Sequence, residues 1–243
     1  AGKVEILPWE TPVGDGDESI AAIYTYGHRL VDGELMDRFP NIKVISNYGV
    51  GVDHIDLEAA KSRGIPVGNT PNVLDGAVAD MTFALLMAAA RNIVIGDRYA
   101  RGPEFIHYDP SLYLGSEIHG STLGIVGMGN IGRAVARRAR GFDMRILYHN
   151  RNRNLGAEDE LCVSYRSLDE ILSESDYIVL NIPLTPETHH LIGRAEFQRI
   201  KPTGILINMA RGGVVDHDAL LEALENKWIA AAALDVTEPE PLP

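Results

Sequence analysis

The residues best suited to chemistry begin with three glycines, Gly127, Gly129 and Gly132, in a G-x-G-x-x-G pattern. An apolar run at 123–126 precedes them, a helical pattern follows, and a second apolar run lies at 144–148. Strand, glycine turn, helix and strand is the order of a unit that binds a dinucleotide. Gly127 would permit the tight turn, Gly129 would let the backbone approach the pyrophosphate, and Gly132 would let helix and strand pack closely. A glycine-rich turn that binds nothing is the alternative.

The turn after the second strand bears on which dinucleotide fits. It reads His-Asn-Arg-Asn-Arg over 149–153. Proteins that bind NAD place an acidic residue in this region, where it contacts the ribose 2′-hydroxyl. This turn has no acid, and Arg151 and Arg153 could pair with a 2′-phosphate, because guanidinium groups match phosphate geometry. We therefore predict that NADP(H) is preferred and that NAD(H) is also accepted. An exposed basic turn without a role is the alternative.

Charged side chains also follow two later strands. Arg211 comes just after an apolar run at 205–207, and ligands of open α/β sheets bind outside the carboxyl ends of strands. Its guanidinium could bind a carboxylate through two hydrogen bonds, although a surface ion pair would also explain it. Asp235 and Glu240 lie at and beyond the end of the last strand, at 229–235. Acids at such an edge can orient a histidine or hold an amide, but prolines among acids are equally typical of a solvated linker.

A shorter glycine loop follows an earlier strand and reads Ser-Asn-Tyr-Gly-Val-Gly-Val-Asp over 46–53. Two glycines can leave backbone N–H groups open to an anion. A plain turn explains the same residues.

The histidines do not predict a metal site. Eight are present, and none lies in a C-x-x-C or H-E-x-x-H pattern. We interpret His189 and His190, which follow an apparent helix start, as a solvated or capping pair.

The elements that would position these residues alternate along the chain, which is typical of an α/β fold with parallel sheets. A long, mostly apolar helical pattern covers 78–92, and the polar and aromatic stretch at 94–118 reads as a long irregular loop. Asp216 is a plausible N-cap for the helix that follows it. Besides the two apolar runs around the glycines, strands are expected at 4–7, 20–25, 43–46, 66–68, 177–182, 204–208 and 229–235, and short helices at 34–39 and 56–63.

Composition narrows the class of protein. The chain has 243 residues and a formal net charge of −12, which argues against a nucleic-acid partner because phosphate neutralisation needs a basic surface. The sequence has no run of 18 apolar residues, so we predict no membrane span, and residues 1–5 lack the apolar core of a signal peptide. Cys162 is the only cysteine, which favours a reducing, cytoplasmic setting.

Together these motifs resemble the D-isomer-specific 2-hydroxyacid dehydrogenases, and within them the glyoxylate/hydroxypyruvate reductases most closely. The likeness runs from about Tyr24 to Pro243. It is carried, in order along the chain, by Val50-Gly51-Val52-Asp53, the Gly127 fingerprint, Pro183-Leu184-Thr185, Asn208-Met209-Ala210-Arg211-Gly212, Leu234-Asp235-Val236 and Glu240-Pro241.

The resemblance implies an α/β fold of two doubly wound parallel-sheet domains. One is a Rossmann dinucleotide-binding domain, and the other is a smaller, flavodoxin-like substrate domain that is incomplete in this chain. We expect a partial substrate-binding domain at 1–73. The dinucleotide-binding domain is expected at 74–243, including a dimerisation helix and loop at 78–118. The family likeness also implies a homodimer.

The activity implied is an oxidoreductase of the NAD(P)-dependent class. A hydride would pass from the nicotinamide cofactor to the carbonyl carbon of a small 2-oxo acid, which becomes the D-2-hydroxy acid, while a histidine paired with a glutamate donates the proton.

The resemblance also assigns roles to individual residues. Arg211 would bind the substrate and polarise its carbonyl, and Glu240 would support the catalytic histidine. Glu238 is not the match, because the family's glutamate directly precedes the second proline. The backbone of Val50 and Gly51 would receive the substrate carboxylate. The cofactor would contact Gly127 and Gly132 in the turn, Gly129, Asn130 and Ile131 at the pyrophosphate, Asn150, Arg151 and Asn152 around the adenosine ribose and its phosphate, Pro183 and Thr188 along its border, Met209 at the nicotinamide ring and Asp235 at the carboxamide.

One departure from the family concerns the proton donor. The family's histidine lies in a Pro-His segment some way after the glutamate, whereas the last histidine here is His217. The family's first strand-helix pair also has no counterpart before Val4. We therefore expect a piece of a longer enzyme with little turnover as written, because a general acid contributes about 10²–10⁴-fold in rate.

Other functions fit parts of the pattern. A phosphoglycerate or D-lactate dehydrogenase of the same family is one, although phosphoglycerate would call for more cations in the first domain. A non-catalytic, dinucleotide-sensing corepressor is another, and it would bind the dinucleotide without needing turnover. A Rossmann methyltransferase is more distant, because it would not need Arg211 and Glu240 in their ordered contexts.

Overall fold

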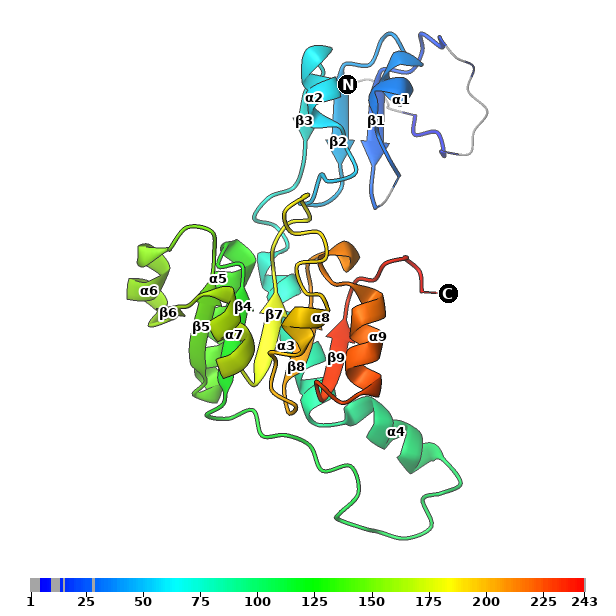
Figure 1. Ribbon diagram of the computed structural model, residues 1–243. Helices are drawn as coiled ribbons and strands as arrows, with labels where there is room; N and C mark the ends of the chain where they lie inside the picture. The colour runs from blue at the N-terminus through cyan, green and yellow to red at the C-terminus, as the bar shows by residue number, and fades with distance from the viewer. Residues whose placement is uncertain (1–4, 10–13, 15, 28, 243) are drawn as a thin grey trace. The chain divides into compact units, whose positions relative to one another are not determined.

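The computed structural model describes residues 5–9, 14, 16–27 and 29–242 (Figure 1). The chain divides into two compact units, Ala1–Val73 and Leu74–Pro243. Each unit has its own parallel sheet, which confirms the α/β parallel-sheet class. The assignment of the units to substrate and cofactor stays a prediction.

The first unit is built on a three-stranded parallel sheet in the order β1-β2-β3. Its core consists of apolar side chains from the strands and two helices, with Ile45 fully buried at the centre of the sheet. Asp32 and Asp56 cap the two helices by accepting backbone N–H groups. The predicted strand at 4–7 is not seen: Val4 lies outside the described residues, and residues 5–7 are not in a strand. The elements are β1 (Ala22–Thr25), α1 (Gly33–Asp37), β2 (Val44–Asn47), α2 (Leu57–Ser62) and β3 (Val67–Gly68).

The second unit contains a six-stranded parallel sheet in the order β6-β5-β4-β7-β8-β9 (Figure 1). Counted from its first strand, this is the order 3-2-1-4-5-6 of a dinucleotide-binding sheet, and the direction of winding reverses between β4 and β7. Ligands bind at such a reversal, outside the carboxyl ends of the strands. The strands are β4 (Thr122–Val126), β5 (Arg145–His149), β6 (Ser164–Tyr165), β7 (Tyr177–Leu180), β8 (Ile205–Asn208) and β9 (Ala231–Leu234).

Helices cover both faces of this sheet, and its central strands β4, β7 and β8 are mostly apolar and buried. Tyr177 and Val179 of β7 pack on one face, against α3 and α5. Ile178 and Leu180 point to the other face, against α7, α8 and α9. Alternation along the strand explains the split. The helices are α3 (Asp75–Ala90), α4 (Ile93–Arg101), α5 (Asn130–Ala139), α6 (Leu155–Leu161), α7 (Leu168–Glu174), α8 (Arg194–Phe197) and α9 (His217–Glu225), with short 3₁₀ turns η1 (Arg140–Phe142) and η2 (Gly212–Val214).

The long apolar helix predicted at 78–92 is α3, whose buried face includes Phe83 and Leu86. The prediction that the whole of 94–118 is an irregular loop was wrong for its first part, because α4 extends to Arg101. Asn92 adopts a left-handed φ of 53°, which ends one helix and lets the next begin in a new direction. Among the described residues, no single helix is long and apolar enough to cross a membrane, and α3 and α4 reach that length and composition only as a pair bent by 58°.

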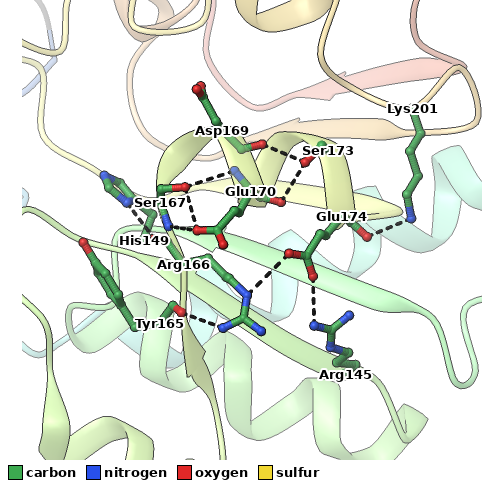
Figure 2. A network of polar contacts seen from close by, with 10 residues as sticks. All are labelled: Arg145, His149, Tyr165, Arg166, Ser167, Asp169, Glu170, Ser173, Glu174 and Lys201. Carbon is green, nitrogen blue, oxygen red and sulfur yellow. Dashed lines mark hydrogen bonds and ion pairs between the residues drawn. The ribbon is translucent and has the colours of Figure 1, made fainter.

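Local capping explains where two helices of the second unit begin. The Asp216 carboxylate accepts the N–H groups of Asp218 and Ala219, which confirms the predicted N-cap of α9. At α7, Ser167 and Glu170 form a reciprocal capping box (Figure 2). These caps satisfy N–H groups that a helix start leaves without partners.

A polar network connects α7 and the residues before it to both ends of β5, Arg145 and His149 (Figure 2). The Glu174 carboxylate accepts a hydrogen bond from Arg145 at 2.8 Å and pairs with Arg166 at 3.5 Å. The backbone carbonyl of Arg166 lies 3.0 Å from Nδ1 of His149. The backbone N–H of Arg166 donates to the Tyr148 carbonyl. The network therefore fixes the residue from which the turn at 149–153 departs.

Candidate active site

Two glycines of the fingerprint are required by the packing of the protein itself. Gly127 has a φ of +105°, and a Cβ at this position would lie 2.5 Å from the carbonyl oxygen of Asn181. A Cβ at Gly132 would collide with the Gly127 carbonyl. A larger residue at either position would push α5 or the end of β7 away from the turn. This turn lies at the winding reversal of the sheet, between β4 and β7.

Gly129 is different, because nothing in the protein explains it. Its φ of −82° suits any residue, and an added Cβ would meet no heavy atom within 4 Å. It is exposed at the start of α5, followed by exposed Asn130 and half-buried Ile131. A helix N-terminus favours negative charge, and open space without a side chain lets a phosphate come close. This arrangement fits the pyrophosphate of a dinucleotide.

Asparagines join the turn at the end of β5 to the glycine turn. Oδ1 of Asn150 accepts the Met128 N–H at 2.7 Å, and Nδ2 of Asn154 donates to the Met128 carbonyl at 3.3 Å. The structure thus brings Asn150 next to the fingerprint, while Arg151 and Asn152 are exposed beyond it.

Arg153 has a different role from the one that the sequence suggested. Its guanidinium donates to both oxygens of Glu158, at 2.7 and 2.6 Å, and the Tyr148 hydroxyl donates to the same carboxylate at 2.7 Å. These hydrogen bonds lower the pKa of Glu158 to about 2, and the bond from Arg153 contributes most. Of the two arginines that could pair with a 2′-phosphate, Arg153 is already bound to Glu158. Arg151 is therefore the remaining candidate for the phosphate. The sequence did not predict a role for Glu158, because only the folded position of α6 brings its carboxylate next to Arg153.

The loop after β7 brings Pro183 and Thr188 together. The Thr188 hydroxyl donates to the Pro183 carbonyl at 2.7 Å and accepts the Thr185 N–H at 2.8 Å. In the same loop, a hydrogen bond from the Thr185 hydroxyl lowers the pKa of Glu187, and the charge of Arg151 adds to that effect. The charge of Arg151, in the turn after β5, therefore acts on Glu187 in the loop after β7.

The turn that carries Arg211 is held by a buried amide. Asn208, at the end of β8, is fully buried. Its Oδ1 accepts the Ala210 N–H at 3.0 Å, and its Nδ2 donates to the Arg211 carbonyl at 2.9 Å. Arg211 is half-buried, and its Nη1 donates to the Ala210 carbonyl at 2.8 Å. Met209 packs into the core on the α3 side of the sheet.

The segment after β9 lies beside this turn. The N–H of Asp235 donates to the Asn208 carbonyl at 3.0 Å. A Cβ at Gly212 would collide with the Thr237 carbonyl, so the two stretches of backbone are in close contact. Asp235 and Glu240 are both exposed. The structure thus brings the Arg211 turn and the start of the acidic segment to one edge of the sheet.

In the first unit, side-chain amides hold the loop after β2. Nδ2 of Asn47 donates to the carbonyls of Gly49 and Gly51, at 3.1 and 2.8 Å, and Nδ2 of Asn69 donates to the Val50 carbonyl at 2.9 Å. Among the described residues, the N–H groups of Val50 and Gly51 have no protein acceptor. Both N–H groups are therefore available to donate to a bound anion.

Comparison with known proteins identifies the family. Residues 83–243 match the family model of the D-isomer specific 2-hydroxyacid dehydrogenase, NAD binding domain. The chain belongs to this family of dehydrogenases. It is 48% identical to a glyoxylate reductase of Thermococcus gammatolerans, over 98% of this chain and 74% of that protein. It is 49% identical to a glyoxylate reductase of Pyrococcus furiosus, over 92% and 68%.

Solved structures similar to this chain have the same fold. The TT0316 protein of Thermus thermophilus aligns with a TM-score of 0.84 at 49% identity, over 90% of this chain and 69% of that one. A glyoxylate reductase of Paecilomyes thermophila aligns with a TM-score of 0.84 at 38% identity, over 93% and 69%. The resemblance read from the motifs is therefore confirmed.

Proposed function

We propose that this dehydrogenase reduces a small 2-oxo acid, glyoxylate or hydroxypyruvate, to the D-2-hydroxy acid. The observation that carries the proposal is Arg211, which the buried Asn208 amide holds at the carboxyl edge of the sheet that also bears the dinucleotide fingerprint. Glyoxylate reductases about half identical to this chain support the same substrate class.

The residues present fit a nicotinamide dinucleotide. The open space at Gly129 suits the pyrophosphate, with Asn130, Ile131 and the close-packed turn around it. Asn150, Arg151 and Asn152 would surround the adenosine ribose, Pro183 and Thr188 would border the cofactor, Met209 would lie at the nicotinamide and Asp235 would hold its carboxamide. When bound, the cofactor supplies the hydride that reduces the carbonyl carbon.

We further propose that NADP(H) is preferred and NAD(H) accepted. Arg151 supports this preference, because its guanidinium is exposed at the turn where a 2′-phosphate would lie. Arg153 does not contribute, since Glu158 occupies it. A preference that depends on one arginine is expected to be about tenfold, which corresponds to about 1.4 kcal/mol.

The residues of the chain would then act on the substrate as follows. The Arg211 guanidinium binds the carboxylate and withdraws electron density from the carbonyl oxygen, which makes the carbonyl carbon more electrophilic. For the first unit taken by itself, we propose that the N–H groups of Val50 and Gly51 can donate to a substrate carboxylate. Glu240 would stabilise the charged form of the proton-donating histidine that the family resemblance implies, because a neighbouring negative charge favours the imidazolium.

We propose that the protein is a homodimer of the cytoplasm. α4 has no buried residue in this chain, and its first turn exposes Ile93, Val94 and Ile95. Ile106 and Leu114, in the stretch that follows, are also exposed. Apolar groups gathered on one segment are typical of a surface that binds a partner. Sedimentation should give twice the chain mass, and a monomer at all concentrations would contradict the dimer.

A substrate panel tests the activity. The purified full-length protein is offered glyoxylate, hydroxypyruvate, pyruvate and 3-phosphohydroxypyruvate, each with NADPH and NADH, and the loss of reduced cofactor is followed. Glyoxylate or hydroxypyruvate should give the highest kcat/KM, and Arg211→Ala should lower it at least 100-fold, about 2.7 kcal/mol. Arg140→Ala, an exposed arginine on η1, is the matched control. Binding of the dinucleotide without turnover of any 2-oxo acid would instead favour a dinucleotide-sensing protein.

A further inference from the structure

Three side chains with metal-binding atoms meet in the second unit, and none of them is among the residues proposed for substrate and cofactor. Nε2 of His190 lies 3.2 Å from Oε2 of Glu238. The rings of His189 and His190 stack with centroids 3.9 Å apart. One donor atom from each of the three lies within 4.8 Å of the others. We propose that His189, His190 and Glu238 bind one divalent transition-metal ion such as Zn²⁺.

The backbone places these donors from two separate segments. His190 has a left-handed φ of 52°, and its N–H donates to the Gly213 carbonyl at 2.8 Å. The Glu238 N–H donates to Nδ1 of His217 at 3.2 Å. A Cβ at Gly213 would lie 3.1 Å from Oε1 of Glu238, so the carboxylate lies directly over this glycine. Both segments therefore meet over η2, and the donors are held near one another by contacts outside the cluster.

The donor set determines the class of metal. Zn²⁺ binds imidazole nitrogen and carboxylate oxygen at about 2.0–2.2 Å, which puts two donors of a tetrahedral ion about 3.4 Å apart. The 3.2 Å between His190 and Glu238 is close to that spacing. Two imidazoles with one carboxylate suit Zn²⁺, Cu²⁺ or Ni²⁺, whereas Mg²⁺ and Ca²⁺ prefer sets of oxygen ligands.

Access and mobility of the side chains agree with a surface metal site. The side chains of His190 and Glu238 are 41% and 46% exposed, so an ion can reach them and water can complete its coordination. His189 is exposed and can rotate to bring its ring nitrogen into place. A bound ion would link the loop after β7 to the segment after β9.

Calorimetric titration of the metal-free, untagged protein with ZnCl₂ tests the proposal. We expect one Zn²⁺ per chain at pH 7.5. MgCl₂ should give no binding, because Mg²⁺ prefers sets of oxygen ligands. His190→Asn and Glu238→Gln should each weaken Zn²⁺ at least tenfold. Asparagine tolerates the left-handed backbone, so the fold is retained.

The matched control is His119→Ala. His119 also lies beside an acid, with Nδ1 3.6 Å from the Asp143 carboxylate, but outside the cluster. Its loss should leave Zn²⁺ affinity unchanged. Equal affinity of the wild type, His190→Asn and Glu238→Gln, or no binding by the wild type at millimolar ZnCl₂, would overturn the proposal. Neither result would bear on the dehydrogenase activity.

Discussion

Replacing Asn208 with alanine tests how the fold positions Arg211. The Asn208 side chain is fully buried and bonds both the Ala210 N–H and the Arg211 carbonyl. Alanine would leave both groups without their partner, and each buried group left in this way costs about 1–3 kcal/mol. Because the chain can relax at this turn, we expect a loss of about 2–4 kcal/mol in the free energy of unfolding. We also expect a fall of at least tenfold in kcat/KM, because the turn that holds the guanidinium is no longer fixed.

The two effects are measured separately. Urea unfolding is followed by the fluorescence of Trp228 in a Trp9→Phe background, so that the signal reports on the second unit. The matched control is Asn226→Ala, which removes an exposed asparagine that donates to the Glu222 carbonyl at 2.8 Å. That change should cost at most about 0.5 kcal/mol. If Asn208→Ala changed stability no more than the control, the amide would not hold the turn and the reasoning would be refuted.

Three further predictions concern the cofactor site. Arg151→Ala should raise the KM for NADPH about tenfold and leave the KM for NADH unchanged. Arg153→Ala should lower the free energy of unfolding without changing the ratio of the two KM values. Equal effects of Arg151→Ala on both cofactors would contradict the role of Arg151 at the 2′-phosphate. Gly132→Ala should destabilise the fold because its Cβ collides with backbone, whereas Gly129→Ala should keep the melting temperature and weaken dinucleotide binding in a fluorescence titration. Glu158 has its pKa lowered from 4.5 to about 2, so its contribution to stability is fully present above about pH 4.5 and is lost as the pH falls towards 2; Glu158→Gln should flatten that part of the stability curve in urea titrations.

The elements of the second unit were largely predictable from the sequence. The apolar runs at 205–207 and 177–182 became neighbouring strands, and Asp216 capped its helix as expected. Each of these features depends on a short stretch of chain, where alternation, helical spacing and capping chemistry act locally. The helix α4 was missed, and none of its residues is buried. Its apolar residues Ile93, Val94 and Ile95 are consecutive, so a short stretch of sequence does not distinguish them from an apolar run in a loop.

The pairing of side chains across the fold was not predictable. Arg153 was considered for a phosphate, but the structure pairs it with Glu158 on the next helix. The sequence indicated a solvated or capping role for His190 and did not match Glu238 to the family's glutamate, yet the two side chains meet although they are 48 positions apart. Such contacts depend on which way each loop turns after its strand, and residue spacing along the chain does not encode that direction.

The sequence by itself determined that this protein has a dinucleotide-binding unit and belongs among the 2-hydroxyacid dehydrogenases. It did so because the strand, the glycine turn and the helix follow one another directly, and because the ordered motifs mark the ends of successive strands. Only the tertiary structure decided which charged side chains pair within the protein, as Arg153 does with Glu158, and which are exposed, as Arg151 is. Asn208 becomes a support for Arg211 only when β8 is buried between two layers of helices, since an amide without water must find its partners in the protein.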